Sequence, residues 1–356
     1  MIFDQERQGL EKLVFFDPLG HEAHFEPGHP ERPERIAAVR EALQQAGWWE
    51  QFPHLAPLSL PEPVLTGVHT PGYLSFLETA CARGAPLDLD TYTTPASWQL
   101  ALNAAGGAAA VAWAVWSGAA RRGFALTRPP GHHATARQGM GFCLLNNIAL
   151  AAHFTLTRPD AGIKAPQRLA IVDLDLHHGN GTQEIFYDRA DVLFCSLHQS
   201  PLYPGSGSLA ERGVGAGAGL TANLPLPPGT GDQGYRTALS AVVLPLLDRC
   251  QPEMLLVSLG YDAHWRDPLG SMLLSAAGYG TLIRQLADWA DAHCAGKLVL
   301  VLEGGYDQMA AQACCQAATA ALLGEAWTDP LGAAPQPERA GWEKVLAAAA
   351  RDWLES

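Results

Sequence analysis

The chain is predicted to be an α/β protein with a central, mainly parallel β-sheet and helices on both of its faces. Short runs of strand-forming residues alternate with longer segments rich in Ala and Leu, which is the pattern of consecutive βαβ units. Several strand candidates are apolar at every position rather than at alternate positions, as expected when both faces of a sheet are covered.

Six strands are predicted, and each is a short apolar run that ends in polar residues or glycine. β-Branched residues stand inside these runs, as in "RLAIVDLD" and "KLVLVLEGGY", and they favour strands. In order along the chain, the strand candidates occupy residues 12–17, 121–131, 168–175, 191–198, 254–262 and 297–306.

Helices are predicted between and after these strands, because Ala and Leu have high helix propensity. The last helix is amphipathic and lies near the C-terminus. No low-complexity linker divides the chain, so we expect one domain over residues 1–356. The helix candidates occupy residues 97–118, 143–157, 233–249, 276–294, 308–323 and about 338–354.

The composition excludes some classes of protein. The formal net charge is −13 over 356 residues, and no cluster of Lys and Arg is present to neutralise nucleic-acid phosphates. No apolar run reaches the roughly 18 residues of a membrane span, and the N-terminus does not read as a signal peptide. Seven cysteines without a C-x-x-C pair indicate reduced thiols, so we expect a cytoplasmic protein.

Polar side chains follow several of the predicted strands at the point where each strand ends. The motifs are "RPPGHHA" at 128–134, "DLDLHHGNGT" at 173–182, "SLH" at 196–198, "GYDAH" at 260–264 and "EGGY" at 303–306. Because ligands of parallel α/β sheets gather at the carboxyl ends of the strands, we expect these groups to converge at one edge.

The segment "DLDLHH" suggests a metal site. In an extended chain Asp173, Asp175 and His177 face one way, while the intervening leucines face the other. Two carboxylates this close repel each other unless a cation lies between them. With Asp262 from another strand, Asp175 and His177 would supply the nitrogen and oxygen ligands of a divalent ion such as zinc. His178 should point away from that ion.

These motifs, together with "GFCLLNN" at 141–147 and "HPERPERI" at 29–36, resemble the zinc-dependent histone deacetylase superfamily. The superfamily includes bacterial histone deacetylase-like amidohydrolases and acetylpolyamine amidohydrolases. The resemblance covers about residues 12–325, with the motifs in the family's order. It implies the arginase/deacetylase fold, and "HPERPERI" resembles the class II branch.

The resemblance implies roles for individual residues. Asp175, His177 and Asp262 resemble the zinc ligands, although Fe²⁺ stays open as the native metal. The groups that resemble the catalytic machinery are the tandem histidines His132 and His133, Tyr306 that donates to the substrate carbonyl, and Asp173 and Asn180 behind the two histidines. Asparagine at position 180 would give His133 a lower pKa than a carboxylate partner would.

A structural potassium ion is also implied by the resemblance. Its ligands would be Asp173 and the main-chain oxygens of Asp175 and His177, together with Ser196 and Leu197. A second monovalent cation is suggested near the backbone oxygens of Phe186, Arg189 and Val192.

The substrate channel is expected to be narrow. Gly141 and Phe142 resemble the residues that form one wall of the family's channel, and His198 is predicted to form the opposite wall. Gly304 would let the tyrosine loop approach the metal. Leu269 stands where relatives that select polyamines carry a glutamate, which favours acyl-lysine as the substrate.

The expected activity is hydrolysis of an acetyl or other acyl group from the Nε amine of lysine in a protein or peptide. Three alternatives remain: a deacetylase of acetylpolyamines or other small acylated amines, an arginase-like dinuclear hydrolase and a non-catalytic acyl-ligand binding module. The second needs further carboxylates, and "GYDAHWRD" offers only Asp262 and Asp267. Neither nucleic acid nor a membrane is an expected partner, and a homo-oligomer is left open.

Overall fold

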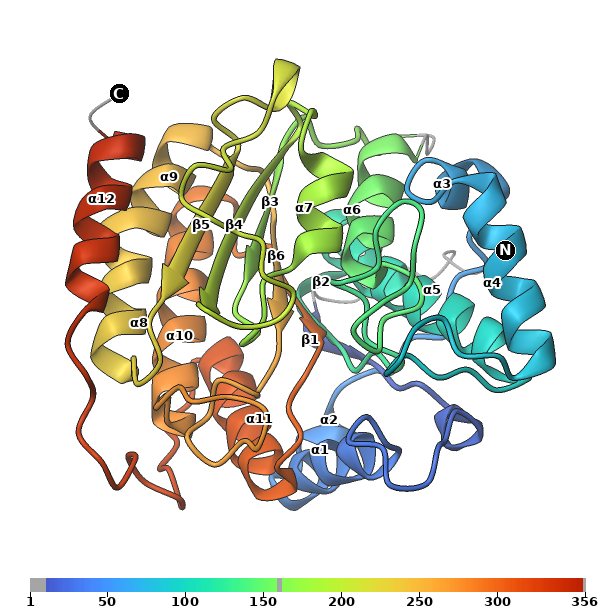
Figure 1. The fold of residues 1–356 in the computed structure, drawn as a ribbon, viewed down its shortest axis with the longest axis horizontal. Helices are drawn as coiled ribbons and strands as arrows, with labels where there is room; N and C mark the ends of the chain where they lie inside the picture. Colours follow the sequence, from blue (N-terminus) through green and yellow to red (C-terminus); the bar gives the residue numbers. More distant parts are fainter. Residues whose placement is uncertain (1–10, 159–161, 355–356) are drawn as a thin grey trace.

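A computed structural model describes residues 11–158 and 162–354. Its centre is one seven-stranded sheet in the order β1-β2-β7-β6-β3-β4-β5, in which all neighbouring strands pair in parallel (Figure 1). This confirms the predicted fold class. The predicted absence of a signal peptide concerns residues 1–10, which lie outside the described part. Among the described residues, no helix is long and apolar enough to cross a bilayer.

The six predicted strands are present, but most are shorter than expected because the polar motifs at their ends leave the extended conformation. The seventh strand, β5, was not predicted. It lies at an edge of the sheet, where its proline is tolerated. The strands are β1 Glu11–Phe16, β2 Ala120–Ala125, β3 Leu169–Asp173, β4 Val192–Gln199, β5 Thr221–Leu226, β6 Leu255–Leu259 and β7 Leu298–Leu302.

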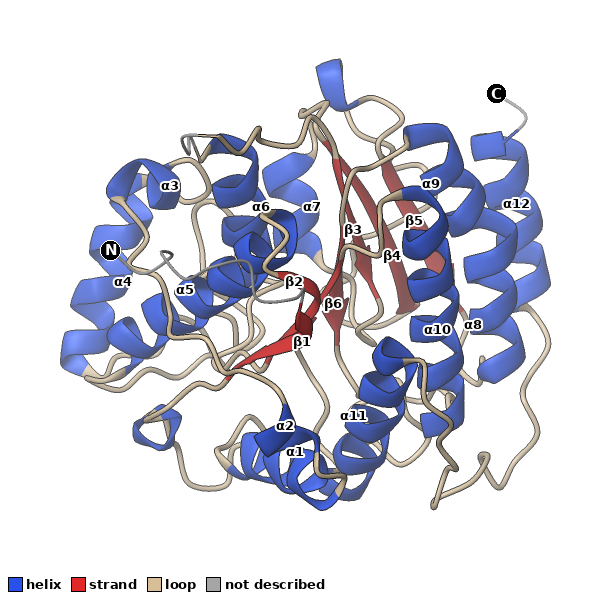
Figure 2. Ribbon diagram, turned by 180° about the vertical axis from the view of Figure 1, so that it is seen from behind, coloured by secondary structure: helices blue, strands red, loops and turns tan. Residues whose placement is uncertain are grey.

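Two apolar cores lie on the two faces of the sheet, and Figure 2 shows helices on both sides. Successive strand residues alternate between them: Leu13 and Phe15 face one core, while Val14 and Phe16 face the other. The second core contains α4 Pro71–Arg83, α5 Ser97–Trp116 and α6 Asn147–Thr157. The first contains α1 Glu34–Gln45, α8 Asp232–Ala238, the π-helical turn η3 Leu239–Val243, α9 Leu244–Cys250, α10 Ala276–His293, α11 Gln308–Leu323 and α12 Trp342–Leu354.

Several helices were missed by the sequence prediction, and they are short or have a proline at their first residue or immediately before it. They are α1, α2 Trp48–Gln51, α3 Glu62–Thr66, α4 and α7 Asn180–Phe186. The predicted helix at 233–249 is continuous but contains the π-helical turn η3.

The C-terminal helix α12 belongs to the core. Trp353 is fully buried in the first core, and the guanidinium of Arg212 lies 4.2 Å from its ring centroid. Arg249 donates a hydrogen bond of 2.6 Å to the carbonyl of Trp353. These contacts attach the helix beside β5 and α9.

Replacing Trp353 with alanine is therefore expected to lower the free energy of unfolding by about 3–5 kcal/mol, the usual cost of removing a large buried side chain. Urea unfolding measures the change. Lys344→Ala, on the exposed face of the same helix, should change stability by less than about 0.5 kcal/mol. Equal stability of Trp353→Ala and the wild type would show that α12 does not pack as described.

Candidate active site

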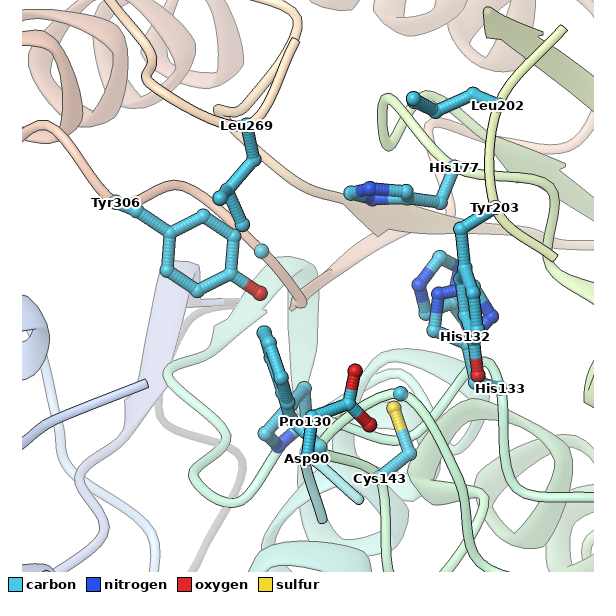
Figure 3. Close-up of a pocket in the computed structure, with 13 residues that line it drawn as sticks. Asp90, Pro130, His132, His133, Cys143, His177, Leu202, Tyr203, Leu269 and Tyr306 are labelled. Atoms are coloured by element: carbon cyan, nitrogen blue, oxygen red, sulfur yellow. The ribbon is translucent and has the colours of Figure 1, made fainter. Parts of the chain in front are cut away.

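A cavity of about 240 Å³ opens at the carboxyl edge of the sheet. Histidines line one side of it, and the hydroxyl of Tyr306 points into it from the other side (Figure 3). It is lined by Asp90, Pro130, His132, His133, Gly141, Phe142, Cys143, His177, Leu202, Tyr203, Leu269, Gly304 and Tyr306. The predicted convergence of the strand ends is thus present in the structure.

Asp175, His177 and Asp262 are brought together beside this cavity, with ligand atoms that all lie within 4.8 Å of one another. β3 ends at Asp173, so Asp175 and His177 lie on a bent segment rather than on an extended strand. Nδ1 of His177 lies 3.1 Å from Oδ1 of Asp175 and 3.2 Å from Oδ2 of Asp262. Leu174 and Leu176 are buried in the core on the other side, as predicted.

This donor set fits a divalent cation. Apart from its ion-pair contact with His177, the buried Oδ2 of Asp262 has no hydrogen-bond partner among the described residues. Burial and the neighbouring charge of Asp175 raise the pKa of Asp262. Although burial opposes it, the two carboxylates raise the pKa of His177 to about 10, which shows how strongly they favour a positive charge at this point. Two carboxylates and one imidazole are ligands that zinc accepts.

Glycine 304 leaves the space that this group needs. Its N–H donates a hydrogen bond of 2.9 Å to Oδ2 of Asp175. A Cβ atom at this position would lie only 2.3 Å from Oδ2 of Asp262 and 2.7 Å from Oδ2 of Asp175. The backbone can therefore approach the carboxylates only because residue 304 has no side chain.

The two tandem histidines have different partners. His132 Nδ1 lies 3.0 Å from Oδ2 of Asp173, and His133 Nδ1 lies 2.7 Å from Oδ1 of Asn180. The amide nitrogen of Asn180 points to the carbonyl of His133 and to Sδ of Met140, so its Oδ1 is the acceptor and His133 Nδ1 carries the proton. Nε2 is then the nitrogen of His133 that is left to accept a proton.

The two histidines also differ in charge. Burial disfavours a charge on His132, but the carboxylates of Asp175 and Asp173 outweigh it and hold its pKa well above the ordinary value. Burial and the charges on His132 and His177 hold the pKa of His133 well below its ordinary value. His133 is therefore the neutral member of the pair, because of its burial and its charged neighbours rather than because of Asn180, whose hydrogen bond raises its pKa.

Tyr306 is held by two buried charged residues. The N–H of Tyr306 donates a 2.6 Å hydrogen bond to Oδ2 of Asp267, while Oδ1 of Asp267 accepts the N–H of Leu269 at 3.0 Å. Arg35 donates from Nε to the carbonyl of Gly305 at 2.7 Å, and its guanidinium lies 4.8 Å from the ring centroid of Tyr306. Burial raises the pKa of the Tyr306 hydroxyl well above its usual range, so the group stays protonated and can donate.

Aromatic rings form the cavity walls. Phe142 has a left-handed backbone with φ of 68° and packs edge-on against Tyr306, with ring centroids 5.8 Å apart. A Cβ atom on Gly141 would lie 2.5 Å from the ring of His133, which explains the glycine. On the opposite side Tyr203 lines the cavity, 5.2 Å from the ring centroid of His133.

The prediction for His198 was wrong. Its ring is buried beneath the loop that carries Tyr203, with Nδ1 at 3.0 Å from Oγ of Ser196 and Nε2 at 3.1 Å from the carbonyl of Gly207. Both ring nitrogens are thereby engaged, and the side chain does not reach the cavity. Tyr203 forms the cavity wall that was predicted for His198.

Two further residues predicted from the motifs, Leu269 and Gly304, line the cavity. His178 turns away from the candidate metal ligands toward Ser206 and Gln183. Of the residues predicted to bind potassium, Asp173 and Ser196 are paired across β3 and β4. Phe186, Arg189 and Val192 lie between the end of α7 and the start of β4, where the carbonyl of Phe186 accepts the N–H of Arg189.

A family model described as "Histone deacetylase domain" matches residues 29–322. The chain belongs to the histone deacetylase family. As a member of this family it is a hydrolase that acts on amide bonds, and the family is generally metal-dependent, in agreement with the donor set of Asp175, His177 and Asp262.

Relatives from archaea, plants and bacteria match over most of this histone deacetylase family chain. A "Probable deacetylase" of Archaeoglobus fulgidus is 43% identical over 83% of the chain and 80% of the relative. The "Histone deacetylase-like amidohydrolase" of Pseudomonas aeruginosa is 38% identical over 85% of the chain and 80% of the relative. The crystal structure of the HDA15 HD domain superposes with a TM-score of 0.86 and 34% identity, covering 98% of this chain and 96% of that one.

Sequence reasoning missed a group of buried residues that surround the cavity. Glu31 is fully buried and accepts hydrogen bonds from Arg128 at 2.7 Å and from Arg35 at 3.1 Å. Glu31 and both arginines belong to the motifs "HPERPERI" and "RPPGHHA". Their pairing was not predicted, because the two motifs lie far apart in the sequence. The role of Asp267 in holding the backbone of Tyr306 was missed for the same reason.

Replacing Gly304 with alanine is expected to weaken binding of the divalent metal by roughly 10- to 100-fold, because the new Cβ displaces the carboxylates of Asp175 and Asp262. Zinc content after dialysis against graded concentrations of a chelator measures the change. Gly72→Ala, where a Cβ meets open space, serves as the control. Unchanged zinc retention in Gly304→Ala would refute this account of the site.

Proposed function

We propose that the protein is a zinc-dependent amidohydrolase that removes acetyl or other acyl groups from the Nε amine of lysine in proteins or peptides. One observation carries this proposal: Asp175, His177 and Asp262 lie at a cavity that has the neutral His133 on one side and the hydroxyl of Tyr306 on the other. In this assignment Asp175, His177 and Asp262 hold the zinc, which when bound polarises an amide carbonyl and lowers the pKa of water.

The side chains around the metal divide the remaining chemistry. His133 accepts a proton from the attacking water at Nε2 and returns it to the leaving amine. His132, held by Asp173, lies beside His133 as an electrostatic partner for the negative charge that develops. The Tyr306 hydroxyl donates a hydrogen bond to the carbonyl oxygen as that oxygen becomes negative.

A potassium ion near Asp173, Ser196 and Leu197 is part of the proposal. Asp173 and Asp175 are both buried at this sheet edge, and a monovalent cation beneath them would offset their mutual repulsion. Phe186, Arg189 and Val192 are proposed for a second monovalent cation by resemblance alone.

We favour acyl-lysine as the substrate because Leu269, which lines the cavity, is apolar where relatives that select polyamines carry a glutamate. The walls formed by Phe142, Tyr203 and Leu269 suit an apolar methylene chain. A specific feature favours the second candidate, an acetylpolyamine: the carboxylate of Asp90 lines the same cavity and would attract a cationic amine. The names of the relatives, deacetylase and amidohydrolase, agree with either substrate.

Turnover of a panel of substrates tests the proposal. Zinc-loaded protein should hydrolyse an acetyl-lysine peptide with a higher kcat/KM than N-acetylspermidine. Tyr306→Phe should lower kcat by about 10²- to 10³-fold, because one donor to the oxyanion is lost, and should retain the zinc. A preference for N-acetylspermidine would support the second candidate, and absence of hydrolysis of every acylated amine would exclude the enzyme assignment.

The partner of His133 generates a pH prediction. Asn180→Asp places a carboxylate at 2.7 Å from Nδ1, which raises the pKa of His133. Since His133 accepts a proton only when it is neutral, the acidic limb of the kcat/KM profile should move to higher pH by about one unit or more. Asn180→Ala removes the acceptor without adding charge and should move that limb downward. An unchanged acidic limb in Asn180→Asp would mean that another group is the base.

A further inference from the structure

A fully buried carboxylate next to the cavity has no part in the chemistry proposed above. Glu303 follows β7 and stands three residues before Tyr306, and its side chain is 0% exposed. Its Oε2 accepts the N–H groups of Gly131 at 2.7 Å and His132 at 3.1 Å, and its Oε1 accepts the hydroxyl of Ser258 at 3.0 Å.

These hydrogen bonds join three segments of the chain at one point. Gly131 and His132 begin the loop of tandem histidines after β2, and Ser258 lies near the end of β6. The backbone of Glu303 is fixed as well, because its N–H donates to Leu259 at 3.0 Å and its carbonyl accepts from Arg35. The carboxylate therefore connects the histidine loop to the segment that leads to Tyr306.

The side chains of Glu303, His132 and Cys143 also approach one another closely enough to suggest a second metal group. The hydrogen bonds argue against this interpretation. Both carboxylate oxygens of Glu303 already accept hydrogen bonds, and Nδ1 of His132 is engaged by Asp173. The arrangement is that of a connecting carboxylate rather than of a ligand awaiting an ion.

We propose that Glu303 is a positioning residue that sets the separation between the tandem histidines and Tyr306. The proposal rests on the proposed function, in which His133 and Tyr306 act on the same substrate from opposite sides of the cavity. Groups that act together need placement within about 0.5 Å, and an error of about 1 Å can cost roughly 100-fold in rate. Hydrogen bonds from backbone N–H groups to a carboxylate are strong enough to maintain such a spacing.

Two near-isosteric substitutions separate the reach of the side chain from its charge. Glu303→Gln retains an oxygen for Gly131 and His132, and its amide can donate to Ser258, but it carries no charge. Glu303→Asp keeps the charge but is one methylene too short to reach both loops. If Glu303 acts by positioning, kcat of Glu303→Gln should stay within about 3-fold of the wild type, whereas kcat of Glu303→Asp should fall by roughly 30- to 100-fold. KM should change little in both variants.

Three further measurements accompany the kinetics. Zinc content should stay at the wild-type level, because the Glu303 side chain forms its hydrogen bonds with Gly131, His132 and Ser258 and not with Asp175, His177 or Asp262. The affinity for a zinc-chelating hydroxamate that occupies the same cavity should fall in Glu303→Asp and stay unchanged in Glu303→Gln. This measurement reports the geometry of the cavity without depending on turnover. Asp232→Ala breaks a similar carboxylate link, to Ser275 in another part of the fold, and should lower Tm without changing kcat.

The outcomes distinguish the two proposals. An inactive wild type would overturn the proposed function, and the hydroxamate affinities would still decide the role of Glu303. If Glu303→Gln loses activity and hydroxamate affinity while Glu303→Asp retains both, the charge of the side chain matters rather than its length, and the positioning proposal is wrong. If Glu303→Asp lowers only Tm, as Asp232→Ala is expected to do, the positioning role is wrong.

Discussion

Burial of several carboxylates at one edge of the sheet is the constraint on which the rest of the site depends. Asp173, Asp175 and Asp262 are all buried there, at the ends of two neighbouring strands. Like charges so close, and removed from water, are stable only when each is compensated. Backbone N–H groups of Asp175, Leu176, His177 and Gly304 and the ring of His132 supply part of this compensation. We expect a cation to supply the rest beside Oδ2 of Asp262, a buried oxygen whose only ion-pair contact among the described residues is with His177.

A second layer of buried charges holds the loops around this centre. Glu31 pairs with Arg128 and Arg35, and Arg35 in turn holds the backbone beside Tyr306. The buried charges of Arg128 and Glu31 offset the desolvation cost of one another, so removal of Glu31 would leave two buried guanidinium groups without their carboxylate. The N-terminal segment thereby supports the loops around the cavity, although its described residues contribute no side chain to the cavity lining or to the candidate metal group.

The sequence was sufficient for the sheet and for the convergence of the strand ends, because apolar runs and parallel topology determine both. It was insufficient wherever a residue acts through a distant partner. β5 was missed because Asn223 and Pro225 interrupt its apolar pattern, and an edge strand tolerates both. His198 was misplaced because its motif position says nothing about the loop above it, whose Gly207 takes up one ring nitrogen. Tyr203 lies in that loop, between two prolines, where no periodicity exists to interpret.

The order of the strands has a consequence for synthesis on the ribosome. β6 and β7, at Leu255–Leu259 and Leu298–Leu302, are the last strands to be made, yet they lie in the middle of the sheet. Until they emerge, the β1–β2 pair and the β3–β4–β5 group are separate halves with open inner edges, which are prone to wrong pairing. Asp262, Glu303 and Tyr306 follow these two late strands. A nascent chain therefore cannot assemble a competent centre early, and premature termination before β7 leaves two half-sheets without any activity.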